Sequence, residues 1–121
     1  MDELLNVKNF QATKAELETE FVELKSKCSL QNEKLKKENK PHFSSSLTAA
    51  THKMKHFNDV SVEEFFKIVR TACDVYKDVE PIQDGSCLKY DKYLIYGVKE
   101  YCAIVYEYPD NSVIIATVHR Q

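Results

Sequence analysis

Two histidines spaced four residues apart are the side chains in this sequence best suited to move protons. They lie in the segment THKMKHF at positions 51–57, where His52 and His56 enclose Lys53 and Lys55. On a helix this spacing places both imidazoles on one face. Imidazole titrates near neutrality, and lysine supplies positive charge at a phosphate. Cleavage of RNA through its 2′-hydroxyl needs a base, an acid and such cations, and it needs no metal.

A third histidine with suitable neighbours lies in the segment IIATVHR at positions 114–120. His119 precedes Arg120, and Thr117 would share one face of a strand with His119. We therefore interpret His52 or His56 as the base or the acid, and His119 as the complementary proton carrier. The substrate contacts predicted with them are Lys53, Lys55, Thr117 and Arg120. The same side chains also suit an exposed helix end and a polar strand terminus, and that interpretation stays open.

Positive charge is concentrated around the first two histidines. The whole chain has a net charge of -2, but residues 34–56 hold six lysines against the single acid Glu38. The flanking segments are acidic. This distribution argues against a general nucleic-acid coat and favours one local basic site, with RNA, tRNA included, as the expected partner.

Neither a metal nor a cofactor is expected. The histidine pair is half of a zinc site, and Lys53 stands where metalloproteases carry a glutamate. The four cysteines form no Cys-x-x-Cys pair. Because their neighbours are apolar, we expect them to be buried free thiols.

A long helix is predicted over residues 10–40. Thr13 and Glu16 form a capping box, and an apolar stripe follows at helical spacing. The stripe consists of Leu17, Phe21, Leu24, Cys28 and Leu35. It can pack against the rest of the domain, or it can form the seam of a homodimer through the N-terminal helix.

Residues 41–60 should form a basic loop with a short helix near positions 47–56, because Pro41 and three serines interrupt the helical pattern. A second amphipathic helix is predicted over 61–80. Ser61 and Glu64 form its capping box, and Pro81 ends it. The predicted core combines both helices with the strands that follow: Leu17, Phe21, Leu24, Phe65, Phe66, Val69, Ile104, Val113 and Ile115.

From residue 86 the apolar period changes to two, and turn residues separate short runs rich in β-branched and aromatic side chains. We expect a three- to four-stranded antiparallel sheet over 86–120. With 121 residues, the chain is predicted to be a single α+β domain. The many tyrosines of the sheet suggest an alternative function. The protein would then be a non-enzymatic binding module, such as an inhibitor, an immunity protein or an adaptor, that uses this sheet or the long helix.

The start of the sequence, MDELLNVKNF, lacks the basic and then apolar layout of a secretory signal. No apolar run approaches the ~18–20 residues that span a bilayer. A cytoplasmic location without membrane contact is therefore expected.

The order of these features resembles the barnase–EndoU–colicin–RelE superfamily of small metal-independent ribonucleases, many of them toxins. The matching residues are His52 with His56, VSVEE at 60–64 and IIATV at 114–118. The resemblance covers residues 50–120 and leaves the first helix as an N-terminal addition. It implies a toxin-type endoribonuclease. A protein inhibitor or another protein binding partner is expected in addition to RNA. Where the family pattern has an arginine after the histidine, this sequence has His56.

Overall fold

The computed structural model describes the backbone of residues 2–120 and the side chains of residues 18–120. Three α-helices, a 3₁₀ turn and five strands form an α+β fold, as predicted. In chain order they are α1 (Asp2–Lys37), β1 (His42–Phe43), α2 (Ser46–His56), α3 (Val62–Val75), η1 (Tyr76–Asp78), β2 (Ile82–Asp84), β3 (Cys87–Tyr96), β4 (Lys99–Glu107) and β5 (Val113–Arg120). Among the described residues, no helix is long and apolar enough to cross a bilayer.

The sheet has five strands in the order β1-β5-β4-β3-β2, and it is mixed. The pairs β2–β3, β3–β4 and β4–β5 are antiparallel, whereas β1 runs parallel to β5 through the pairs His42–Ile114 and Phe43–Ile115. The prediction of three or four antiparallel strands was therefore wrong in number and direction. β1 and β2 contain only two and three residues. Such short strands are too brief to show an alternating pattern.

Local capping explains where α2 and α3 begin. The Ser45 hydroxyl accepts a hydrogen bond from the Thr48 amide at 3.1 Å, and the Ser61 hydroxyl accepts one from the Glu64 amide at 3.0 Å. These serines satisfy amides that the first turn leaves without partners. The capping box predicted at Ser61 is thus where α3 starts. The helix gives way to η1 before Pro81, close to the predicted end.

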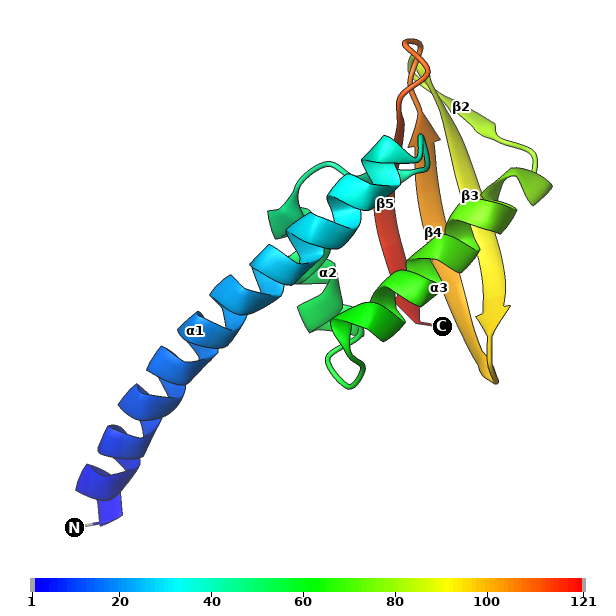
Figure 1. Ribbon diagram of the computed structural model, residues 1–121. Coiled ribbons are helices and arrows are strands. Elements are labelled where there is room, and N and C mark those ends of the chain that lie inside the picture. The colour runs from blue at the N-terminus through cyan, green and yellow to red at the C-terminus, as the bar shows by residue number, and fades with distance from the viewer. Residues whose placement is uncertain (1, 121) are drawn as a thin grey trace.

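The long helix begins at Asp2 and not near Thr13. Residues 2–12 contain neither glycine nor proline, so nothing in them breaks a helix that continues through the capping-box pattern. Figure 1 shows the N-terminal part of α1 extending away from the sheet. Toward its C-terminal end, Cys28 and Leu35 are fully buried in the core, and Phe21 and Leu24 pack against that core. The apolar stripe therefore packs within the domain over residues 21–35, while the Leu17 side chain lies outside the described residues.

Helix α3 crosses one face of the sheet (Figure 1) and contributes six buried residues to the core. Of the predicted core residues, Phe65, Phe66, Val69 and Ile115 are buried, and Val113 packs on a second cluster formed by Tyr76, Tyr90 and Val105. The prediction that Ile104 belongs to the core was wrong. Its neighbours Ala103 and Val105 are buried, so strand alternation turns Ile104 to the opposite face, where it is only half-buried.

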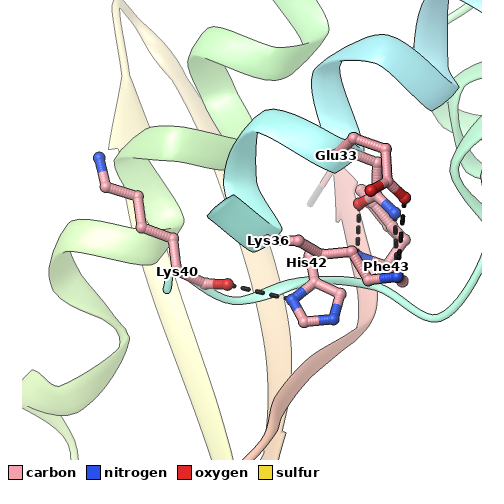
Figure 2. A network of polar contacts seen from close by, with 6 residues as sticks. Glu33, Lys36, Lys40, His42 and Phe43 are labelled. Atoms are coloured by element: carbon pink, nitrogen blue, oxygen red, sulfur yellow. Dashed lines mark hydrogen bonds and ion pairs between the residues drawn. The ribbon is translucent and has the colours of Figure 1, made fainter. Parts of the chain in front are cut away.

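The β1 edge of the sheet is closed by a side chain from α1. The carboxamide of Asn32, itself buried, donates to the Phe43 carbonyl at 3.0 Å and accepts from the Phe43 amide at 2.8 Å. Figure 2 shows these bonds at the Phe43 main chain, with His42 on the same short strand. Asn32 thus takes the place of a neighbouring strand and fixes β1 against β5.

Candidate functional site

Three histidines from two distant segments form a row beside β5. The ring centroids of His52 and His56 are 6.0 Å apart, and those of His56 and His119 are 5.9 Å apart. His52 and His56 lie on consecutive turns of α2, whereas His119 comes from β5, which α2 accompanies along its outer edge (Figure 1). The fold therefore brings together the three predicted proton carriers, with His56 in the middle. We call these residues the histidine row.

The helix backbone fixes the orientation of His52. Its Nδ1 lies 2.9 Å from the Thr48 carbonyl oxygen, one turn earlier in α2. A carbonyl oxygen can only accept, so Nδ1 carries the proton and Nε2 of the neutral ring is left as the acceptor. The ring also lies against buried Phe43, with centroids 5.6 Å apart. His52 is thus held with its basic nitrogen directed away from its own helix turn.

The central imidazole is biased toward its neutral form. Burial lowers the pKa of His56 below its ordinary value, and the positive charges of His52, His119 and Lys55 lower it further. Neighbouring imidazoles repel one another when both are protonated, so such a group favours a neutral ring beside a charged one. A neutral base next to a protonated acid is the combination that acid–base catalysis requires.

His119 and Thr117 share one face of β5, as predicted. His119 pairs with Cys102 and Thr117 with Ile104, and the residue between them, Val118, is fully buried in the core. Thr117 is half-buried on the same side as His119. Both side chains therefore lie on the strand face that is turned away from the core.

Arg120 does not point toward the histidine row. It follows His119 and so lies on the opposite face of β5, where its guanidinium forms an ion pair with Asp59 and lies over the Phe57 ring at 5.6 Å. The hydrogen bond that the Arg120 guanidinium donates to Asp59 raises the pKa of Arg120 and lowers that of the Asp59 carboxyl. The arginine thus ties the last strand to the loop after α2, a role that the sequence did not reveal.

The predicted lysines do not lie together. Lys53 lines a groove of about 420 Å³ between α1 and α2, together with Phe21, Leu24 and Met54. Lys55 is exposed, and its charge acts on His56. Lys55 is therefore the predicted cation that accompanies the histidine row. The fourth histidine, His42, is separate, and its Nδ1 donates to the Lys40 carbonyl at 3.1 Å (Figure 2).

Within the described residues, no group of three or more His, Cys, Asp or Glu side chains is arranged to hold a metal ion. The four cysteines are free; Cys28 and Cys102 are buried, whereas Cys73 and Cys87 are half-buried. Burial raises the pKa of the Cys28 thiol to about 11, and that of the Cys73 and Cys102 thiols to about 12. These three thiols therefore stay protonated near neutrality.

Comparisons with known protein families, with curated protein sequences and with solved structures found no match for this chain.

Proposed function

We propose that the protein is a metal-independent endoribonuclease that acts through the histidine row. The observation that carries the proposal is the approach of His119, on β5, to the α2 pair His52 and His56, at ring separations of 5.9 and 6.0 Å. A catalytic nitrogen must come within roughly 3 Å of the atom it serves. Neighbouring imidazoles at these separations can contact one phosphodiester from two sides.

The reaction assigned to the site is an internal transesterification. Neutral His56 takes the proton of the 2′-hydroxyl, and the 2′-oxygen attacks the adjacent phosphorus. Protonated His119 gives its proton to the departing 5′-oxygen. The products are a 2′,3′-cyclic phosphate and a 5′-hydroxyl end, so atoms and charges balance. Lys55 would offset the charge of the phosphate, and Thr117 would add a hydroxyl contact beside His119.

The test is cleavage of total RNA and of tRNA by purified protein in the presence of EDTA. Loss of one acid–base group should lower the rate about 10²- to 10⁴-fold, so His56→Ala and His119→Ala should be nearly inactive. His42→Ala is the matched control, because His42 lies outside the row. The ends of the products should be cyclic phosphates. An inactive wild type, or equal activity in all variants, would reject the proposal.

A second candidate function is a non-enzymatic binding module, an inhibitor, immunity protein or adaptor. It is favoured by apolar side chains around the β3–β4 hairpin: Tyr93, Ile95 and Val98 are 63%, 67% and 97% exposed. However, Tyr76, Tyr90 and Tyr101 are buried, so the tyrosines do not form one binding face. Stoichiometric binding of a protein partner, lost in Tyr93→Ala and accompanied by no RNA cleavage, would select this function over the first.

A further inference from the structure

The two edges of the sheet differ in how completely other parts of the chain cover their main-chain groups. At β1, the Asn32 carboxamide occupies the amide and the carbonyl of Phe43, and α2 accompanies the remainder of β5. At the other edge, β2 pairs only with residues 87–89 of β3. On the side of β3 that faces away from β4, no strand in the described part of the chain pairs with residues 90–96, the longer part of β3 (Figure 1). This segment is the free edge.

A groove runs along the free edge. Its volume is about 530 Å³, and its walls come from the C-terminal half of α3, from η1, from β3 itself and from Glu100 of β4. Thr71, Val75 and Asp78 line it on the helical side, and Leu94 lines it on the strand side. An additional strand on this edge would therefore find room for the side chains that it directs toward the helices.

Over its last four residues the free edge lacks the devices that usually prevent strand addition. Residues 93–96 read YLIY, without charge, glycine or proline. Tyr93 and Ile95 point away from the core and are 63% and 67% exposed. Natural edge strands usually carry lysine, proline or a bulge, because an unprotected apolar edge is a template for another strand. Lys92 directly precedes these four residues, and its amine forms an ion pair with Asp78 at 3.9 Å.

We propose that the free edge binds a second copy of this chain, β3 against β3, with the two-fold axis at Leu94. A two-fold axis makes the pairing antiparallel and reciprocal. In this register Tyr93 faces Ile95 of the second copy on the outer side, and Lys92 faces Tyr96 on the helical side. Aromatic side chains opposite aliphatic ones stabilise antiparallel pairs. The two five-stranded sheets become one continuous sheet.

Neighbouring registers are less favourable. An axis at Lys92 places two like charges opposite each other, which is destabilising. An axis at Tyr93 places Asp91 opposite Ile95, although Asp91 already accepts a hydrogen bond from Cys102 at 3.1 Å. The axis at Leu94 avoids both the lysine pair and the Asp91–Ile95 pair. It also places Leu94 of each copy at the groove that Val75 lines.

The experiment is sedimentation equilibrium of the full chain from low to high micromolar concentration. The wild type should dimerise reversibly. Ile95→Lys should raise the dimer dissociation constant at least about tenfold, because lysine is a natural protector of strand edges. Ile82→Lys is the matched control: Ile82 is 62% exposed on the same sheet face but belongs to β2. It should leave the constant unchanged, and hydrogen exchange at residues 92–96 should slow as the wild type dimerises.

Three results would overturn the inference. The first is a wild type that stays monomeric. The second is a dimer that Ile95→Lys does not weaken, which would point to another surface such as α1. The third is equal weakening by both substitutions, which would indicate a contact through the open sheet face and not through the edge. The inference is independent of the ribonuclease proposal, since none of its residues belongs to the histidine row.

Discussion

Replacement of Asn32 by alanine should destabilise the protein far more than its place on a mostly exposed helix suggests. Asn32 is 3% exposed and makes two hydrogen bonds, of 3.0 and 2.8 Å, to the main chain of the fully buried Phe43. Alanine would leave a buried amide and a buried carbonyl without partners. Each such group costs about 1–3 kcal/mol, so the expected loss in the free energy of unfolding is roughly 2–6 kcal/mol. That is a large part of the ~5–15 kcal/mol typical of a domain.

The assay is urea denaturation of Asn32→Ala beside Glu33→Ala. Glu33 is exposed and forms only a 3.6 Å ion pair with Lys36, so its loss should cost at most about 0.5 kcal/mol. Asn32→Asp adds a pH test. A protonated carboxyl can still donate to the Phe43 carbonyl and an ionised one cannot, so the folded state raises the pKa of the new group, and this variant should lose stability as pH rises. If Asn32→Ala costs no more than Glu33→Ala, the amide does not hold β1 in place.

Two further predictions concern the histidine row and the core. In an NMR titration His56 should have a pKa below the usual ~6.5. His119→Asn should raise this pKa, because it removes a positive neighbour. An unchanged pKa of His56 in the variant would show that the charge of His119 does not act on His56. The pKa of His56 is lower in the folded state than in the unfolded state, so protonation of His56 favours unfolding. The stability that neutral His56 contributes is therefore fully present above pH ~6.5 and is lost as the pH falls through the folded-state pKa. In the core, Phe65→Ala should cost about 3–5 kcal/mol, since the ring is fully buried against three aromatic side chains. Val22→Ala, at an exposed position, should cost less than about 0.5 kcal/mol, and similar losses in both would place Phe65 outside the core.

Local signals in the sequence predicted the elements that depend on local chemistry. The capping box at Ser61 and the apolar spacing after it predicted α3, and the alternating residues predicted β3, β4 and β5. The failures involve partners distant in the sequence. Asn32 and β5 hold the two residues of β1 in an extended conformation. The serine-rich sequence around β1 gives no sign of either partner, because both are distant along the chain.

In the candidate site, too, local sequence patterns predicted some features, whereas contacts between distant segments were missed. The i, i+4 spacing was enough to place His52 and His56 together on α2, and alternation placed Thr117 with His119. Alternation also implies that Arg120 faces away from His119, a consequence that the list of expected phosphate contacts overlooked. The ion pair with Asp59 could not be predicted, because it depends on how the loop after α2 meets the end of β5.

The most direct test of the central proposal is the rate at which His56→Ala cleaves a single-stranded RNA in EDTA, measured beside the wild type and His42→Ala. His56 is the middle member of the row, and its lowered pKa suits a base near neutrality. We expect His42→Ala to match the wild type and His56→Ala to be slower by about 10²-fold or more, while both remain folded. A His56→Ala protein that cleaves as fast as the wild type would contradict the proposal.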